Sequence, residues 1–169
     1  VSSEEDLRAV VSLTRREGII NPLEELSITN ILSLDRKTAS DAMTPRTVVF
    51  SLPAEMTVAE TRGQGKGVWP HSRIPVHAAD DPENIVGIVY RREVLEALAN
   101  DQDDKRLSDL AKPVRFVLDT MTLDRVLVKF LESRMHLFVV LDEYGGVSGV
   151  ITLEDVLEEI LGKIGRAHV

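Results

Sequence analysis

The spacing of apolar residues predicts two helices at the start of the chain and a different pattern after Asp35. A first apolar stripe at helical spacing follows the capping-box sequence Ser2-x-x-Glu5 and stops before Gly18, which suits a helix end. A second helix is predicted to begin at Asn21-Pro22, because Asn caps a helix well and Pro is tolerated at the first helical position. We therefore expect residues 1–40 to form a helical linker ahead of the main unit.

Short apolar runs and capping residues after the linker predict strands and helices in the order βαββα. Strand-like runs occupy residues 48–50, 74–76 and 85–90, a helix begins at Thr57 with Glu60 three positions later, and another helix follows the last strand. Pro75 suggests the end or the edge of a sheet, because Pro cannot donate a backbone hydrogen bond. The same order recurs, with strands at 114–117, 137–141 and 147–151 and helices that start at Thr122 and Thr152.

This recurrence is an internal repeat with a constant offset over its best-matched part. Gly87 and Gly149 are 62 positions apart, and so are Leu95 and Leu157. Two copies are too few for a solenoid, so we expect them to pack face to face as a pseudo-two-fold pair of the α/β (α+β) class. The predicted units are the helical linker at 1–40, one repeat at 41–100, a second repeat at 101–162 and a tail at 163–169.

Composition and charge narrow the class of protein. Apolar residues make up 43% of the chain, which excludes a wholly disordered protein, and no apolar stretch approaches the roughly 20 residues that cross a bilayer. A net charge of −8 argues against general nucleic-acid binding but allows a small basic pocket for one phosphorylated ligand. Cysteine is absent, so disulfides and thiolate metal sites are excluded. The chain starts without Met, and we expect a fragment of a longer protein.

The sharpest candidate site is the sequence Thr152-x-x-Asp155. A hydroxyl and a carboxylate at a helix start lie beside free backbone N–H groups that favour phosphate, and the carboxylate can accept both hydroxyls of a ribose. The same residues also fit an ordinary helix cap, and both roles can hold for one pair of side chains. The equivalent positions of the first repeat are Tyr90-Arg91-Arg92-Glu93, so we expect one functional site and one altered site.

Other candidates for chemistry have simpler interpretations. The histidines have no metal-ligand spacing, and Asp101–Asp104 lacks the glycine and the glutamate of a calcium loop, so we expect no metal site. The glycine-rich segment Gly63–Gly67 lacks the ending of a phosphate-binding loop and is predicted to be a frayed helix end. No Ser/His/Asp, Cys/His or paired-carboxylate set stands out, so we expect a protein that is not an enzyme. The histidines are His71, His77, His136 and His168.

The repeat resembles a tandem pair of CBS domains, also called a Bateman module. Gly149-Val150-Ile151-Thr152-Leu153-Glu154-Asp155 matches the nucleotide-binding pattern of that family, which fixes a Gly, a Thr or Ser, and an Asp or Asn. Three stretches are similar to the CorC/CorB and cyclin M (CNNM) group of membrane proteins that are associated with Mg²⁺/Co²⁺ transport. They are Asp41–Thr47, Ser72–Val76 and Asp142–Ile160, and the resemblance covers nearly the whole chain.

The resemblance implies one nucleotide site shared by both repeats. An adenine nucleotide, ATP with Mg²⁺ or else AMP, would bind where the Thr-x-x-Asp motif of the second repeat meets the opening strand and the Ser-x-x-Pro strand of the first. Arg46 and Arg73 are the phosphate candidates, because guanidinium pairs with phosphate bidentately. The implied nucleotide-binding residues are Thr44, Thr47, Val49, His71, Ser72, Arg73, Ile74, Pro75, Thr152 and Asp155.

The resemblance also implies a role and partners. The chain would be the regulatory part, itself soluble, of a divalent-cation (Mg²⁺/Co²⁺) transport or efflux protein, on the cytoplasmic side of the inner or plasma membrane beside a transmembrane DUF21-type domain. Nucleotide binding would rearrange a homodimer of CBS modules. The alternative is a ligand-free structural dimerisation module that pairs the apolar faces of the last helix of each repeat. Those faces are Val94, Leu95 and Leu98, and Val156, Leu157, Ile160 and Leu161.

Overall fold

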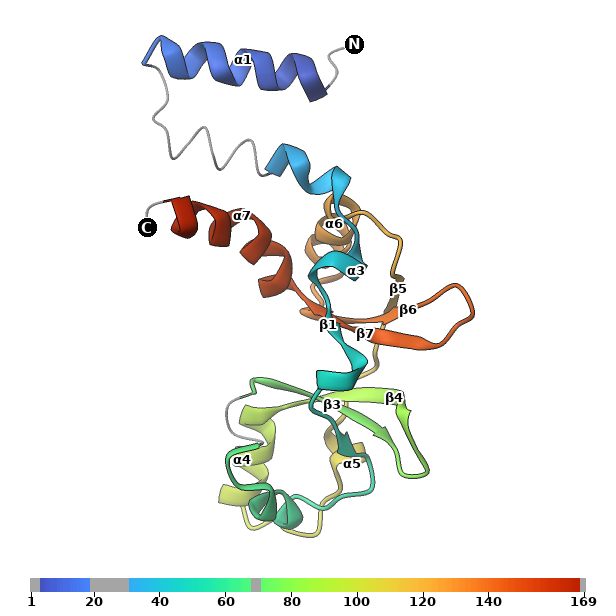
Figure 1. Ribbon diagram of the computed structural model, residues 1–169. Coiled ribbons are helices and arrows are strands. Elements are labelled where there is room, and N and C mark those ends of the chain that lie inside the picture. Colours follow the sequence, from blue (N-terminus) through green and yellow to red (C-terminus); the bar gives the residue numbers. More distant parts are fainter. Residues whose placement is uncertain (1–3, 19–30, 68–70, 168–169) are drawn as a thin grey trace.

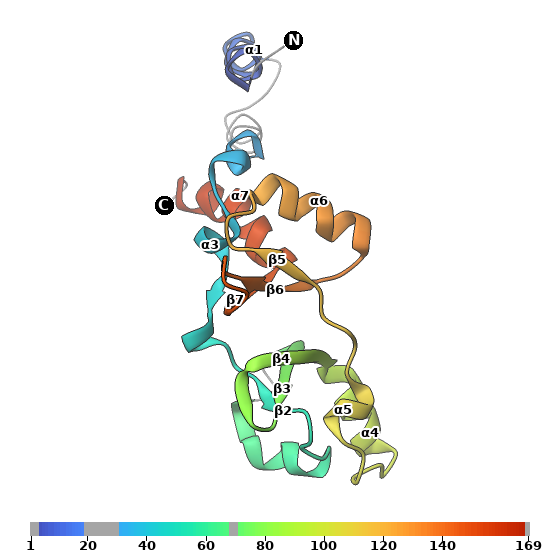
Figure 2. The ribbon, with the colours of Figure 1, turned by 90° about the vertical axis from the view of Figure 1, so that its right-hand side faces the viewer.

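The computed structural model describes residues 4–18, 31–67 and 71–167 and divides most of them into two stacked halves (Figure 1). The upper half in Figure 1 contains a four-stranded sheet in the order β1-β7-β6-β5, and the lower half contains a three-stranded sheet in the order β2-β3-β4. Figure 2 shows that the two sheets face each other and that helices cover their outer sides. This arrangement confirms the predicted α/β pair of packed repeats.

The two halves are built from the following elements. The lower half contains β2 (Leu52–Pro53), the 3-10 helix η3 (Ala59–Gly67), β3 (Arg73–Ala78), β4 (Asp81–Tyr90), α4 (Arg91–Ala99) and α5 (Leu107–Leu110). The upper half contains η1 (Ser33–Arg36), α3 (Ala39–Ala42), β1 (Thr44–Pro45), β5 (Phe116–Leu118), α6 (Leu123–Ser133), β6 (Leu137–Leu141), β7 (Val147–Thr152) and α7 (Leu153–Ala167). The 3-10 helix η2 (Arg46–Val48) leads from the upper half to the lower one, and α1 (Glu4–Arg16) lies beyond the upper half.

Each half contains the opening segment of the other repeat. β1, at the start of the first repeat, pairs antiparallel with β7 of the second, with Thr44 opposite Val150. In the same way the start of the second repeat packs on the first: α5 contacts α4 and β4, and Ile88 and Lys112 exchange two backbone hydrogen bonds of 3.0 and 2.8 Å. Neither half is therefore complete without chain from both repeats.

Two glycines at equivalent positions of the repeat allow these segments to approach. A Cβ on Gly149 would overlap the carbonyl oxygen of Thr44. A Cβ on Gly87 would lie 2.9 Å from the Cβ of Ala111 and 3.1 Å from the carbonyl oxygen of Lys112. A side chain at either position would push the opening segment away from the strand that it covers, which explains why both copies carry glycine there.

Three apolar clusters hold the molecule together. In the upper half, the rings of Phe130 from α6 and Phe138 from β6 lie with their centroids 4.4 Å apart within the largest cluster. The lower half has its own cluster of buried residues around β3, β4 and α4. A third, small cluster joins the two sheets through Ile88, Leu137 and Val150. Each half thus has a core, and one apolar contact couples the cores.

The structure corrects the predicted start of each repeat. The strand predicted at residues 48–50 is wrong: Arg46–Val48 form a 3-10 helix, and short strands lie on either side of it, at Thr44–Pro45 on β7 and at Leu52–Pro53 beside β3. The counterpart of β2 in the second repeat is β5, which also pairs parallel with the next strand of its own repeat and starts at Phe116 rather than at Val114. A short segment that pairs across repeats has no signature in the local apolar pattern.

Pro75 lies in the middle strand of its sheet and not in an edge strand. β2 nevertheless pairs only with Val76 and His77 of that strand, so Pro75 has a strand partner on one side only, where it faces Ile88. The missing N–H of Pro75 therefore costs no ladder hydrogen bond on its open side.

The helix predictions are largely confirmed. Gly18 has a φ of +79° just after α1, as a helix end requires, whereas the helix start predicted at Asn21 lies outside the described residues. The Thr57–Glu60 capping box is present, but the helix that follows it is a 3-10 helix through Gly67 instead of a frayed α-helix. α7 continues to Ala167, so the predicted tail is helical to that point, and His168 lies outside the described residues.

The predicted dimer faces are only partly exposed. Val94, Val156 and Ile160 are buried in the two cores, so they are not available to a partner. Leu95 and Leu157, at equivalent positions of the repeat, are exposed. Helical periodicity identified the apolar residues of these helices but could not say which of them the chain's own core would use.

We expect Gly149→Ala to destabilise the protein, because the added methyl group overlaps the Thr44 carbonyl oxygen. Overpacking of this kind costs about 1–3 kcal/mol, and each kcal/mol lowers the melting temperature by about 2–4 °C. Gly63→Ala is the matched control, since its Cβ would meet nothing within 4 Å. Thermal unfolding followed by circular dichroism measures both variants, and equal melting temperatures would contradict the role given to Gly149.

Candidate functional site

The junction between β7 and α7 brings Thr152 and Asp155 together. Thr152 ends the strand and Leu153 begins the helix, so both side chains lie at the first helical turn. The backbone N–H of Thr152 donates to Oδ2 of Asp155 at 2.9 Å, and the backbone N–H of Asp155 donates to the Thr152 hydroxyl at 3.1 Å. This is the capping box that the sequence predicts, and both residues are half-buried.

The equivalent junction of the lower half, between β4 and α4, is built differently. Tyr90 makes no side-chain hydrogen bond to the start of α4, and the Arg92 guanidinium lies 5.6 Å from the centroid of its ring. One oxygen of Glu93 pairs with Lys112 at 3.4 Å, and the other is buried without a hydrogen-bond partner. A tyrosine and a longer carboxylate thus stand here in place of the hydroxyl and the short carboxylate of the upper half, and the two residues between them, Arg91 and Arg92, are cationic.

A cavity of about 370 Å³, here named the arginine cavity, opens at this lower junction. Nη1 of Arg73 lies 3.4 Å from a carboxylate oxygen of Glu154, which is the residue before Asp155 on α7. Nε of Arg73 is buried and has no hydrogen-bond partner. The Arg73–Glu154 ion pair therefore joins the cavity to the helix start that carries Thr152 and Asp155. The lining residues are Ser72, Arg73, Tyr90, Arg91, Arg92 and His136.

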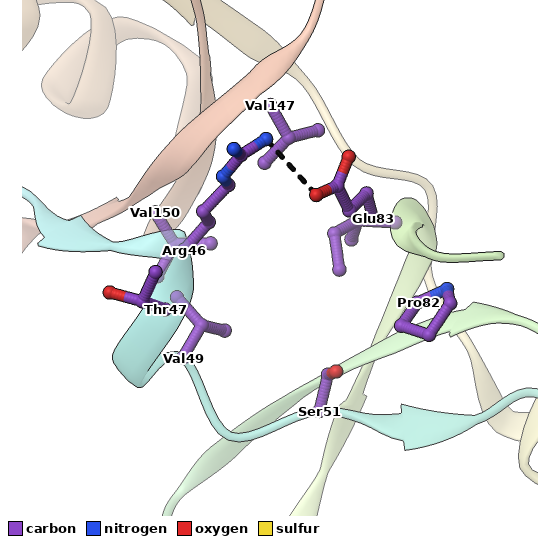
Figure 3. A pocket seen from close by; sticks show the side chains of 9 residues that line it. Arg46, Thr47, Val49, Ser51, Pro82, Glu83, Val147 and Val150 are labelled. Atoms are coloured by element: carbon purple, nitrogen blue, oxygen red, sulfur yellow. Dashed lines mark ion pairs between the residues drawn. The ribbon is translucent and has the colours of Figure 1, made fainter.

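A second cavity, of about 290 Å³, is lined by the starts of β4 and β7 and is here named the hairpin cavity (Figure 3). Arg46 and Glu83 point toward each other across its mouth, with Nη1 and Oε1 3.0 Å apart. Both halves contribute to its walls, since Glu83 belongs to the lower half and Val147 to the upper. The lining residues are Arg46, Thr47, Val49, Ser51, Pro82, Glu83, Ile85, Val147 and Val150.

The structure divides the predicted nucleotide residues between these two cavities. Arg46, Thr47 and Val49 line the hairpin cavity, whereas Ser72 and Arg73 line the arginine cavity. The two phosphate candidates, Arg46 and Arg73, therefore lie in different cavities.

The other predicted residues of the first repeat line neither cavity. Thr44 is held in β1 opposite Val150, and Ile74 and Pro75 are buried in β3. His71 stacks on Phe50, with ring centroids 5.0 Å apart and planes inclined by 12°. These residues are held by backbone pairing and by packing.

Sequence reasoning missed the cationic lining of the arginine cavity. Arg91 and Arg92 were visible only as a departure from the Thr-x-x-Asp pattern, and His136 only as a histidine without metal spacing. The available signal was the charge itself: two adjacent arginines where the other repeat carries none. Glu83 had no local signal, because its partner Arg46 is far away in sequence.

Comparison with known proteins identifies the repeat. The sequence model of the CBS domain matches residues 39–100 and 107–162. The chain belongs to the CBS domain family. Its CBS pair is similar to the CBS domain of a bacterial CNNM/CorC family Mg²⁺ transporter, with a TM-score of 0.86 and 30% identity over 96% of this chain and 98% of that one. A CBS domain of such a transporter in complex with ATP matches with a TM-score of 0.76 and 31% identity, over 83% of this chain and 99% of that one.

A curated relative extends the comparison beyond the CBS pair. The UPF0053 protein sll1254 of Synechocystis is 38% identical over 163 residues, which are 96% of this chain and 46% of that protein. The CBS pair thus spans less than half the length of this relative. No helix among the described residues combines the length and the apolar character that spanning a bilayer requires.

Thr152→Ala is expected to cost about 1 kcal/mol of stability, or about 2–4 °C in melting temperature, because the N–H of Asp155 loses its acceptor. Thr122→Ala is the matched control, since Thr122 is the N-cap of α6 but makes no side-chain capping bond. Thermal unfolding measures both variants. If Thr122→Ala lost as much stability as Thr152→Ala, the loss in Thr152→Ala could not be assigned to the capping hydrogen bond.

Proposed function

We propose that this CBS pair is a regulatory module that binds an adenine nucleotide, ATP with Mg²⁺ or else AMP, for a divalent-cation (Mg²⁺/Co²⁺) transport or efflux protein. The observation that carries the proposal is the Thr152–Asp155 pair at the start of α7, next to the Glu154 that meets Arg73. The ATP complex of a CNNM/CorC transporter CBS domain, 31% identical to this chain, supports the choice of ligand.

The first turn of α7 offers contacts that complement a nucleotide. The Asp155 carboxylate accepts the N–H of Thr152 with one oxygen and has further lone pairs that can accept ribose hydroxyls. Backbone N–H groups at a helix start lack intrahelical acceptors, and together with the helix dipole they favour phosphate oxygens. In this proposal the ribose binds at Asp155 and the phosphates extend toward the arginine cavity.

The arginine cavity supplies the charge that the phosphates need. Arg73, Arg91 and Arg92 bring three guanidinium groups to one cavity of a chain whose net charge is −8. A guanidinium can bind two phosphate oxygens at once, and the unpartnered Nε of Arg73 is a donor that such an oxygen would satisfy. Mg²⁺ bound to the nucleotide would lower its repulsion from the acidic chain.

Nucleotide binding has a route to a change of conformation. A phosphate that binds Arg73 competes with Glu154, and this ion pair joins β3 of the lower half to α7 of the upper half. Replacing it changes the interaction between the halves, and the ligand favours whichever arrangement binds it more tightly. The regulatory units of this proposal are the repeats at 41–100 and 101–162.

The proposed assembly is a homodimer of CBS pairs attached to a transmembrane DUF21-type domain on the cytoplasmic side of the membrane. Leu95 of α4 and Leu157 and Leu161 of α7 support a dimer, because they are large, apolar and exposed on the last helix of each repeat. The same leucines favour the alternative, a ligand-free structural dimerisation module. The two functions differ in whether nucleotide binds, which the following titrations decide.

Asp155→Ala is expected to weaken nucleotide binding about tenfold or more, because a hydrogen bond to a charged group contributes about 1.5–3 kcal/mol. Isothermal titration of the whole chain with ATP, with AMP and with each plus Mg²⁺ measures the effect. Glu60→Ala is the matched control, since Glu60 occupies the same capping position at the start of η3. No heat at millimolar nucleotide would leave the dimerisation module as the function, and unchanged affinity in Asp155→Ala would contradict the ribose contact proposed for Asp155.

Arg73→Gln is expected to weaken the binding of ATP about tenfold and the binding of AMP less, because a triphosphate reaches further into the arginine cavity. Arg62→Gln is the control, since Arg62 is an exposed arginine that pairs with Asp103 at 3.2 Å outside both cavities. Arg46→Gln is titrated in parallel. If Arg46→Gln loses more ATP affinity than Arg73→Gln, the phosphates belong to the hairpin cavity.

A further inference from the structure

The hairpin cavity lies apart from the groups proposed to hold the ribose and the phosphates. It is lined by Val147 and Val150 of β7, whereas Thr152, the last residue of that strand, does not line it. Neither Asp155 nor Arg73 lines the cavity. It is therefore a separate space, and its chemistry can be considered independently of the nucleotide.

The walls of this cavity suit a small ligand with an apolar body. Ile85 and Val150 are the buried residues of its lining, here called its base, and Val49 and Val147 are half-buried. Its volume of about 290 Å³ lies at the lower limit of the roughly 300–1,000 Å³ that is usual for ligand pockets. A compact aliphatic group would fill the base and remove these methyl groups from water.

The mouth of the cavity adds a charge pattern. Arg46 and Glu83 form a neutral pair with their charged atoms 3.0 Å apart, and Figure 3 shows both side chains directed across the opening. A ligand that carried only a carboxylate would gain Arg46 but would be repelled by Glu83. A ligand that carries an ammonium and a carboxylate side by side can place its carboxylate against Arg46 and its ammonium against Glu83, so that each charge contacts a charge of opposite sign.

We propose that the hairpin cavity binds the zwitterion of an aliphatic α-amino acid. The carboxylate pairs with Arg46, the ammonium pairs with Glu83, and the side chain packs on Val49, Ile85 and Val150. Thr47 and Ser51 add hydroxyl groups to the lining that can complete the hydrogen bonds of the two charged groups. Because both halves line the cavity, an amino acid bound there acts on the same arrangement of the halves that a nucleotide would, and the coupling between the two sites is reciprocal.

Isothermal titration of the whole chain with L-leucine, without nucleotide, tests this site directly. L-leucine is expected to bind, and two analogues are expected to bind about tenfold more weakly or worse, because each loses one charged contact. The analogues are 4-methylpentanoate, which lacks the ammonium group, and 3-methylbutylamine, which lacks the carboxylate. The proposal is overturned if L-leucine gives no heat up to its solubility limit, or if 4-methylpentanoate binds equally well.

Glu83→Gln keeps the shape of the side chain and removes its charge, so it is expected to weaken L-leucine about tenfold. Glu96→Gln is the matched control, since Glu96 is an exposed glutamate on α4 that lines neither cavity. A thermal melt of each variant checks that it is folded. Equal L-leucine affinity in the two variants would show that Glu83 does not bind the ammonium group, and the proposal that the cavity binds a zwitterion would be overturned.

Methyl NMR of the labelled chain locates the bound amino acid. L-leucine is expected to shift the methyl signals of Ile85, Val147 and Val150, and to leave Ile160 in the upper core unchanged. If the largest shifts fall instead on Leu153, beside Asp155, the amino acid occupies the nucleotide site and the proposal fails. This experiment needs no nucleotide, so its outcome is independent of whether nucleotide binds.

Discussion

The fold depends on one close contact, in which the carbonyl oxygen of Thr44 lies against the backbone of Gly149 where any side chain would stand. The same arrangement occurs at Gly87, which is packed against the backbone of Lys112. Each contact holds the start of one repeat on the last strand of the other. The repeats therefore cannot separate without each half losing a segment that completes it, and two small copies behave as one folding unit.

The position of both cavities follows from that contact. β1 pairs with the middle of β7, at Gly149 and Val150, and does not cover the two ends of β7. The end at Thr152 begins α7 and faces the arginines of the lower half, and the start at Val147 faces the first residues of β4. Between them, Ile88, Leu137 and Val150 form the apolar contact of the two sheets. A ligand bound at either end of β7 would therefore act on the arrangement of the two halves from one side of this central apolar contact.

Features that repeat along the chain, or that involve residues close in sequence, could be predicted from the sequence. Contacts between the two repeats became visible only in the structure. The constant offset from Gly87 to Gly149 was enough for the paired architecture, and the Thr152–Asp155 capping box was readable because its members are three positions apart. The strand at Thr44 was missed because its stability comes from β7, not from its own residues. The division of the predicted site between two cavities was equally hidden, since Arg46 is placed by Glu83, a residue far away in sequence.

Among the described residues, the ion pairs Arg73–Glu154 and Arg46–Glu83 bridge the halves, and they differ in how far water screens them. The Arg73 side chain is 21% exposed and keeps a buried Nε without a partner, whereas that of Arg46 is 54% exposed. An exposed pair contributes at most about 1 kcal/mol, because water screens it, whereas a less exposed charge interacts more strongly. In the proposed function, exchange of Glu154 for a phosphate at Arg73 would therefore change the interaction between the halves more than an exchange at Arg46. The ligand proposed for the hairpin cavity would act mainly through the apolar base around Val150, which is itself part of the contact between the sheets.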